Sequence, residues 1–383
     1  MSCSVYVVAG EVSGDTHGAE LMEALQSELE NVEFRGLGGK AMAELAGEGV
    51  TDWVDDAAVV GFIEVIKRYG WFKEIFDRTL REIVAWKPEV LLLVDYPGFN
   101  LRLAKQVKEL SPETKIVHYV APQVWAWNQK RIPQIAASHD LMLCLFPFEV
   151  PLFEQAGLKT CWVGHPLVDE LEEKRISVQR DKGVVGLFPG SRRKEVSRIF
   201  PLMLETVKVV RKRNPEVIFK TAAASEKVQV LMQTLLAESG ISDEVVQIQL
   251  GQSQELMQQV GLGVVASGTA TLEAAYYGMP YCLVYRVAWP TFLVARQVVK
   301  LPHIGLINIL AGREVVPEFI QNDANSYELA GWLGRHLENE ELRTTLQNDL
   351  LEAASKLGET GVHRRAAHEI FKLVTHDRSS GTQ

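Results

Sequence analysis

The sequence Val184-Val185-Gly186-Leu187-Phe188-Pro189-Gly190-Ser191-Arg192-Arg193-Lys194-Glu195 runs from a short apolar segment through a Gly-Ser turn into a helical pattern. A second stretch, Val264-Val265-Ala266-Ser267-Gly268-Thr269-Ala270-Thr271-Leu272-Glu273-Ala274, repeats this plan. Each pattern predicts a buried parallel strand, a loop and a helix N-terminus. The first N–H groups of a helix lack intrahelical partners and lie at its positive end, so they favour anions. Two such turns, with Arg192, Arg193 and Lys194 beside the first, predict a phosphate-bearing ligand between them.

The alternative is that both turns are ordinary strand-to-helix connections in which Ser and Thr serve only as N-caps. Neither turn matches a common nucleotide fingerprint, since the GxGxxG and GxxxxGK[ST] patterns are absent from the chain. The arginine in the first turn and Glu273 inside the helix after the second favour the ligand-binding interpretation.

Length and composition indicate the class of protein. A chain of 383 residues usually forms two domains, and 47% hydrophobic with 23% charged residues is typical of a globular protein. The net charge of -9 argues against a nucleic-acid partner, because phosphate backbones require a basic surface. The four cysteines have no paired spacing, which argues against a disulfide framework or a zinc site and favours a reducing cytosol.

The N-terminal residues lack the basic region and long apolar core of a signal peptide, and no apolar run is long enough to span a bilayer. We therefore expect a cytoplasmic protein that is either soluble or peripheral to a membrane.

Short apolar runs alternate with helical patterns along the chain, which predicts parallel sheets with helices on both faces. The predicted strands cover residues 5–9, 34–37, 90–94, 116–120, 141–145, 160–163, 184–188, 217–221, 245–249, 262–266 and 281–285. A charged segment without an apolar run, residues 170–182, is interpreted as a linker. The expected fold is α/β, with two doubly wound, Rossmann-like domains facing each other across a cleft. The expected domains are residues 1–173, residues 174–340 and a helical tail, residues 341–383, for which packing back on the first domain is one alternative.

Polar residues follow the predicted strands of the first half, where ligands of open parallel sheets bind. Asp95 ends a strand beside a Pro-Gly turn, so it is either a base that reaches a ligand or a cap of that turn. Glu11 and Ser13 lie in the first loop, where they could hold an acceptor or brace Asp95. For Asp15 we favour a capping role in the helix that is expected from about Thr16. No metal site is predicted, because the histidines here have no ligand spacing to a partner.

Two further stretches have unusual composition. Tyr119 to Trp127 is aromatic-rich and is followed by Lys130 and Arg131, a combination that suits sugar rings and anions, or else a packed loop. Residues 59–73 mix apolar side chains with lysine and arginine, which is typical of a helix in a membrane interface but equally of a core or dimer-contact helix. The membrane-contact candidates are Phe62, Ile66, Trp71 and Phe72.

Taken together, ordered motifs between about residues 8 and 321 resemble one family closely: lipid-A-disaccharide synthase, a glycosyltransferase of the GT-B fold. The motifs that carry the resemblance are Ala9-Gly10-Glu11-Val12-Ser13-Gly14-Asp15, Gly61-Phe62-Ile63-Glu64-Val65, Asp95-Tyr96-Pro97-Gly98-Phe99-Asn100, Tyr119-Val120-Ala121-Pro122-Gln123-Val124-Trp125-Ala126-Trp127, Phe146-Pro147-Phe148-Glu149, Gly164-His165-Pro166-Leu167, Pro189-Gly190-Ser191-Arg192, Ser267-Gly268-Thr269-Ala270-Thr271-Leu272-Glu273, Tyr285-Arg286 and Asn308-Ile309-Leu310-Ala311-Gly312-Arg313-Glu314-Val315-Val316-Pro317-Glu318.

The resemblance implies transfer of a diacylated glucosamine from UDP to the primary hydroxyl of diacylglucosamine 1-phosphate. The products would be a β-1,6-linked disaccharide phosphate and UDP, formed with inversion in lipid A biosynthesis. It implies no cofactor and no metal. Because the acylated substrates come from a bilayer, it favours the membrane interpretation of residues 59–73 and a peripheral location on the inner face of the inner membrane. A homodimer is also compatible with the resemblance.

By motif match, the resemblance implies a role for each candidate residue. Asp95 would be the base, and Glu11 and Ser13 would line the reaction centre. The residues that would bind UDP are Gly190, Ser191, Arg192, Ser267, Gly268, Thr269, Glu273, Arg286 and Asn308.

The chain departs from the family pattern in two places. Residues 303–307 separate Pro302 from Asn308, where members more often have Leu-Pro directly before the Asn. Gly98 stands where some members carry a second Asp. The alternatives are another GT-B enzyme that acts on UDP-sugars, a non-catalytic membrane scaffold that binds UDP-lipid, or a nicotinamide oxidoreductase. The absence of GxGxxG argues against the oxidoreductase, and the presence of Asp95 argues against the scaffold.

Overall fold

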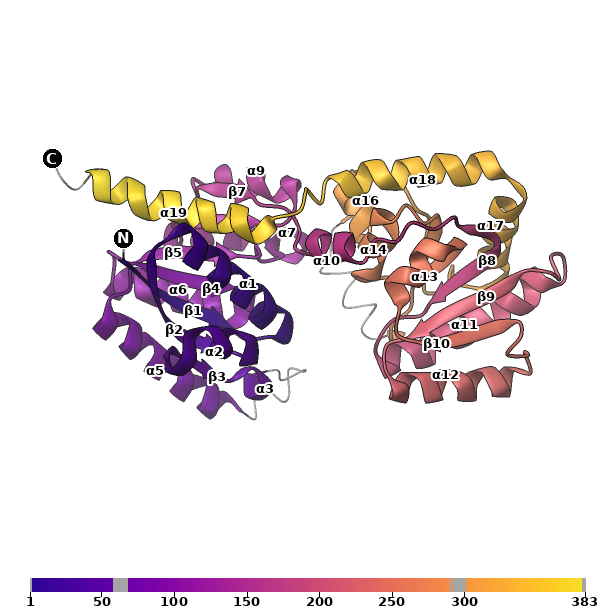
Figure 1. Ribbon diagram of the computed structural model, residues 1–383, viewed down its shortest axis with the longest axis horizontal. Coiled ribbons are helices and arrows are strands. Elements are labelled where there is room, and N and C mark those ends of the chain that lie inside the picture. Colours follow the sequence, from indigo (N-terminus) through magenta and orange to yellow (C-terminus); the bar gives the residue numbers. More distant parts are fainter. Residues whose placement is uncertain (1, 58–67, 290–291, 293–300, 381–383) are drawn as a thin grey trace. The chain divides into compact units, whose positions relative to one another are not determined.

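The computed structural model describes residues 2–57, 68–289, 292 and 301–380 (Figure 1). The chain divides into two compact units, of which one comprises Met1–Pro166 with Glu359–Gln383 and the other Leu167–Gly358. The first unit therefore contains both ends of the chain.

The first unit is built on a seven-stranded sheet in which every neighbouring pair is parallel. Its strands are β1 (Ser2–Ala9), β2 (Asn31–Gly38), β3 (Val50–Asp52), β4 (Val90–Val94), β5 (Lys115–Tyr119), β6 (Leu141–Cys144) and β7 (Thr160–Trp162). Their spatial order is β3-β2-β1-β4-β5-β6-β7, so the direction of winding reverses between β1 and β4. Ligands of such sheets bind beyond the carboxyl ends of the strands at this reversal.

The helices of the first unit are α1 (Val12–Glu28), α2 (Lys40–Ala46), α3 (Val54–Ala57), α5 (Tyr69–Trp86), α6 (Pro97–Leu110), α7 (Val124–Trp127), α8 (Ile132–Ser138), α9 (Val150–Glu154) and α19 (Val362–Ser380). The central strand β4 is buried along its whole length, because its five apolar residues have helices or neighbouring strands on every side. One core cluster joins β1 and β4 to α5 and α6. The last helix, α19, packs along α1 (Figure 1).

The second unit repeats the design with a six-stranded parallel sheet in the order β10-β9-β8-β11-β12-β13. Its strands are β8 (Asp181–Phe188), β9 (Ile218–Ala223), β10 (Val246–Leu250), β11 (Val260–Ala266), β12 (Tyr281–Tyr285) and β13 (Glu318–Ile320). Its helices are α10 (Leu167–Glu173), α11 (Arg193–Arg211), α12 (Glu226–Ser239), α13 (Ser253–Gln259), α14 (Ala270–Tyr276), α16 (Leu306–Ala311), α17 (Ser326–Glu338) and α18 (Glu340–Ser355). Here the winding reverses between β8 and β11.

The predicted α/β class with two parallel sheets is confirmed, but some local expectations were wrong. The segment 170–182 is not simply a linker, since α10 ends inside it and β8 begins in it at Asp181. Charged side chains are tolerated there because the first three residues of β8 are exposed. The compact units end at Pro166 and Gly358, so α10 and α18 belong to the second unit.

The thiols of all four cysteines are free, in agreement with the expected absence of a disulfide framework. Among the described residues, no helix is long and apolar enough to cross a membrane.

Candidate active site

The turn after β4 has an unusual backbone. Asp95 and Tyr96 have φ angles of 46° and 47°, and Val120, at the end of the neighbouring strand β5, has a φ of 69°. Left-handed conformations are rare for residues other than glycine and concentrate at functional sites. Hydrogen bonds hold this turn, because the Asp95 N–H donates to the Tyr119 carbonyl at 2.9 Å and the Asn100 side chain donates to the Asp95 carbonyl at 2.8 Å.

The Asp95 carboxyl lies in an environment that favours its protonated form. Burial raises its pKa, and the nearby carboxylate of Glu11 raises it further, whereas the Tyr96 N–H and His17 act in the opposite direction. A carboxylate with a raised pKa is a stronger base than an exposed one, which is the property that general-base catalysis requires.

Glu11 lies close enough to Asp95 to raise its pKa. Glu11 and Ser13 are both exposed at the beginning of α1, which follows β1, the neighbour of β4 in the sheet. Asp15, two residues further, has a different role from the one expected. Its buried carboxylate accepts hydrogen bonds from the N–H groups of Gly39, Ala41 and Met42, at 2.7, 3.0 and 3.1 Å. Asp15 therefore caps α2 rather than its own helix, because Gly39 is the N-cap of α2.

A cavity of about 420 Å³ lies in the second unit and contains no candidate catalytic residue. A second cavity, of about 370 Å³, lies in the first unit and contains Asp95. Asp95, Gln123, Trp127 and Arg131 line this second cavity. Trp127 is 49% exposed, and the Arg131 guanidinium makes no ion pair or hydrogen bond within the described parts of the chain. The cavity thus combines a carboxylate, an aromatic face and an available cation.

The neighbouring tryptophan serves a structural purpose instead. Trp125 is 5% exposed, and its indole N–H donates to the Glu149 carboxylate at 2.9 Å. Glu149 also accepts from the Phe146 N–H at 3.0 Å, and burial raises its pKa to about 7. The aromatic loop therefore has one tryptophan in the core and one in the cavity, and contact of Trp127 with a sugar ring stays a prediction.

In the second unit, the two glycine turns follow strands that are neighbours in the sheet. Phe188 of β8 pairs with Val265 of β11, so both turns leave the same edge at the reversal of winding. Gly190 and Gly268 have φ angles of 105° and 148°, which a residue with a side chain rarely adopts. The sheet thus brings together the two turns that the sequence predicts to hold one anion.

Side-chain caps do not occupy these turns. The N-cap of α11 is Arg192 and that of α14 is Thr269, and neither helix has a side-chain cap hydrogen bond. Ser191, Arg192, Gly268 and Thr269 are exposed, and Ser267 is half-buried. The backbone N–H groups at the beginning of α11 are therefore not consumed by Ser or Thr side chains, as the alternative interpretation required.

Glu273, in α14, is half-buried. Burial and the nearby carboxylate of Glu170 raise its pKa to about 7, while a hydrogen bond with Gln254 and the charge of Lys174 oppose the shift. A carboxyl held in this state can donate or accept a hydrogen bond near neutral pH.

The side chains of Arg286 and Asn308 form hydrogen bonds with residues outside the two turns. Arg286 follows β12, donates to the Gln321 carbonyl at 3.4 Å and lines a cavity of about 600 Å³ with residues of α11, α12 and α17, but with none of the two turns. Asn308 is fully buried, and its amide bonds the backbone of Val315 and Val316 and the Glu318 carboxylate. Contact of Asn308 with UDP stays a prediction, and it would require some of these bonds to break.

Hydrogen bonds fix the segment before Asn308, in which the chain departs from the family pattern. The N–H groups of Ile304 and Gly305 both donate to the Glu318 carboxylate at 2.9 Å, so this carboxylate fixes the entry to α16 as well as the Asn308 side chain.

Of the membrane-contact candidates, Phe62 and Ile66 lie outside the described residues. Trp71 and Phe72 are partly buried and pack against the first unit's core, with ring centroids 6.0 and 6.5 Å from that of Trp53. Membrane contact by these four residues stays a prediction.

Comparison with known proteins identifies the family of the whole chain. Residues 5–372 match the lipid-A-disaccharide synthetase family. The chain belongs to this family. A lipid-A-disaccharide synthase from Geobacter sulfurreducens is 38% identical over 379 residues, which cover 97% of both chains. The activity is accordingly that of a lipid-A-disaccharide synthase, a glycosyltransferase of lipid A biosynthesis that acts on lipid A precursors.

Solved structures of other enzymes share the fold. The UDP-GlcNAc 2-epimerase from Neisseria meningitidis, bound to UDP-GlcNAc, aligns with a TM-score of 0.58 and 12% identity over 97% of this chain and 100% of that one. MurG from Acinetobacter baumannii aligns with a TM-score of 0.57 and 13% identity over 97% of this chain and 99% of that one. The resemblance to the family and the predicted GT-B class are thus confirmed.

Proposed function

We propose that Asp95 is the general base of an inverting transfer between UDP-2,3-diacylglucosamine and 2,3-diacylglucosamine 1-phosphate. Asp95 takes the proton of the acceptor's primary hydroxyl while that oxygen forms a bond to the anomeric carbon of the donor. The bond from this carbon to the diphosphate breaks, and its electrons leave with UDP. The observation that carries the assignment is the left-handed turn that places Asp95, with a raised pKa, in a cavity with Trp127 and Arg131.

The same cavity suits the rest of the acceptor. The face of Trp127 can cover the sugar ring, and the Arg131 guanidinium can pair with the acceptor's phosphate. Glu11 and Ser13 border the reacting hydroxyl in this proposal, and Glu11 also keeps the pKa of Asp95 raised.

The departing diphosphate is assigned to the two turns of the second unit. Gly190, Ser191, Ser267, Gly268 and Thr269 offer a loop surface in which glycine backbones permit close approach. Arg192 supplies a positive charge, which stabilises the negative charge that develops on the diphosphate as it leaves. Glu273 binds the ribose hydroxyls in this assignment, and Arg286 and Asn308 complete the UDP site.

These assignments give the two units different substrates. The first unit binds the acceptor and approaches the membrane surface through residues 59–73, which places the enzyme on the inner face of the inner membrane. The second unit binds the UDP-sugar. A homodimer that forms through residues 59–73 is the alternative use of the same segment.

A direct assay tests the substrates and the independence from metal together. Purified protein is mixed in detergent with both substrates and a chelator, and the products are separated. We expect UDP and a β-1,6-linked disaccharide 1-phosphate in equal amounts. Release of UDP without the disaccharide would indicate hydrolysis or a different acceptor and would contradict the proposed pair. Tight UDP binding without turnover would favour a non-catalytic scaffold.

A further inference from the structure

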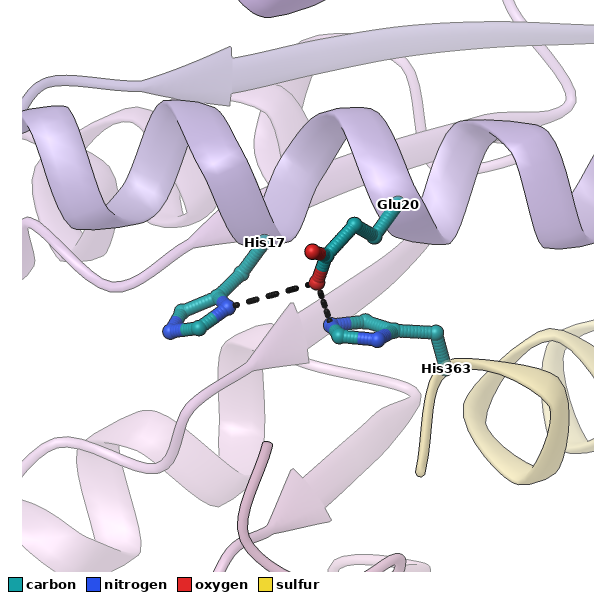
Figure 2. Close-up of side chains that lie close together, drawn as sticks. All are labelled: His17, Glu20 and His363. Carbon is teal, nitrogen blue, oxygen red and sulfur yellow. Dashed lines mark ion pairs between the residues drawn. The ribbon is translucent and has the colours of Figure 1, made fainter. Parts of the chain in front are cut away.

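Three side chains that bind metals well meet between the first and the last helix of the first unit. His17 and Glu20 lie three residues apart on α1, and His363 lies near the beginning of α19 (Figure 2). The Glu20 Oε2 atom is 3.7 Å from His17 Nδ1 and 3.2 Å from His363 Nε2. All three ligand atoms lie within 4.8 Å of one another.

These distances agree with the edges of a small coordination sphere. Zinc binds histidine nitrogen and carboxylate oxygen at 2.0–2.2 Å, so tetrahedral ligand atoms stand about 3.4 Å apart. The two contacts with Glu20 fall on either side of this value. Figure 2 shows both imidazole nitrogens turned toward the same carboxylate.

His17 provides a second, independent indication. Its Nδ1 atom is buried and takes part in no hydrogen bond with the described residues, and its contact with Glu20 is longer than a hydrogen bond. Buried polar atoms are normally satisfied, and an exception needs an explanation such as an ion or water.

We propose that His17, Glu20 and His363 form a zinc site. Two imidazoles and one carboxylate are a common protein ligand set for zinc with a water in the fourth position, whereas magnesium and calcium prefer oxygen ligands alone. The site joins α1 to α19 and so ties the C-terminal end of the chain to the helix that follows the Glu11 loop. It is a stabilising site, and none of its three ligands is assigned a step in the proposed glycosyl transfer.

The alternative for the same geometry is a pair of ion pairs, in which protonated His17 and His363 share the Glu20 carboxylate. A matched control distinguishes the two. His368, one turn and a half further along α19, has its Nδ1 atom 3.6 Å from Glu28 of α1, so it also makes a His–Glu contact between these helices. That contact contains no second histidine and therefore offers no three-ligand site.

The experiment is calorimetric titration of ZnCl2 into tag-free protein from which metal has been removed. We expect one zinc per chain, a dissociation constant raised at least about tenfold in His17→Ala and in His363→Ala, and no change in His368→Ala. With saturating zinc, the midpoint of thermal unfolding should rise in the native protein and in His368→Ala only, because a ligand that binds the folded state stabilises it. Cobalt in place of zinc should give the visible absorption of a four-coordinate site.

Glu20→Gln keeps the test decisive if either alanine variant fails to fold, because Glu20 is half exposed and its replacement preserves the shape of the side chain. It should also lose zinc. Absence of zinc binding by the native protein, or a zinc affinity in Glu20→Gln and the histidine variants that equals that of the native protein, would overturn the proposal. Zinc held by the partly exposed thiol of Cys161 would give the second result.

Discussion

Arg192 and Glu195 form an ion pair across the first turn of α11, with 3.0 Å between Nη1 and Oε1. The Arg192 side chain is 82% exposed, so the pair is screened by water and holds the guanidinium weakly. A phosphate that binds at the Gly190 turn can therefore replace Glu195 as the partner of Arg192 with little loss of free energy. Glu195 keeps the side chain at the turn until then.

Arg192→Ala should weaken UDP binding by about 1.5–3 kcal/mol, the usual contribution of a charge-assisted hydrogen bond. Calorimetry with UDP measures this directly. Arg213→Ala, which removes an exposed arginine beyond the other end of α11, should leave the affinity unchanged. Equal affinity of Arg192→Ala and native protein would move the diphosphate site to another place.

Asp95→Asn should lower turnover by at least about 100-fold while UDP affinity stays nearly constant, because the amide cannot accept the proton of the acceptor. Asp52→Asn provides the control, since Asp52 is exposed at the end of β3 on the same sheet. A mutant of Asp95 that retains most of its activity would exclude this residue as the base.

The pH profile gives a second test of Asp95. Since the base must be ionised, kcat/KM should fall as pH decreases through the pKa of this carboxyl. Burial and Glu11 raise that pKa above its ordinary value, so the acid limb should lie at higher pH than for an exposed aspartate. Glu11→Gln should move the limb to lower pH, and a profile that is identical in both proteins would contradict the coupling.

Glu273→Gln should change stability and UDP affinity in opposite directions. The pKa of Glu273 is raised to about 7, so the stability that its protonated form contributes is fully present below the unfolded pKa and is lost as pH rises through 7. The neutral glutamine avoids this loss, and the variant should be more stable at pH 8 by on the order of 1 kcal/mol, with the difference vanishing near pH 4. Thermal unfolding at both pH values measures this.

UDP affinity of the same variant should fall by about 1 kcal/mol, because a carboxamide offers one acceptor oxygen to the ribose where a carboxylate offers two. Unchanged affinity together with the stability gain would show that Glu273 is buried for another reason and does not bind the ribose.

The sequence indicated those elements whose signal is local. β4 is an uninterrupted apolar run, so its prediction as residues 90–94 matches Val90–Val94. By contrast, β3 and β13 were not predicted, because three residues at a sheet edge, partly exposed, carry too little periodicity. Each of these strands forms because it pairs with a neighbouring strand, and that neighbour lies in another part of the sequence.

The site shows the same limit. The Gly190 and Gly268 turns were recognisable because each has its whole pattern within about a dozen residues. The target of Asp15 and the meeting of His17 with His363 were not, since the partners lie in other elements that only the folded chain brings close. Trp125 and Trp127 are two residues apart in one motif, yet only the tertiary structure separates the core residue from the one in the cavity.

Residues 59–73 give a prediction that separates membrane contact from packing. Phe62→Ser combined with Ile66→Ser should lower binding to anionic liposomes at least about tenfold, because each apolar side chain contributes roughly 1.5–3 kcal/mol when it leaves water. Sedimentation with liposomes measures this, and Val230→Ser with Leu250→Ser, which changes two exposed apolar residues of the second unit, is the control. Phe72→Ser should instead lower the midpoint of thermal unfolding, since its ring packs against Trp71 and Trp53. If the Phe62 and Ile66 variant binds liposomes like native protein but sediments as a smaller species in analytical ultracentrifugation, the segment is a contact between subunits and the membrane surface lies elsewhere.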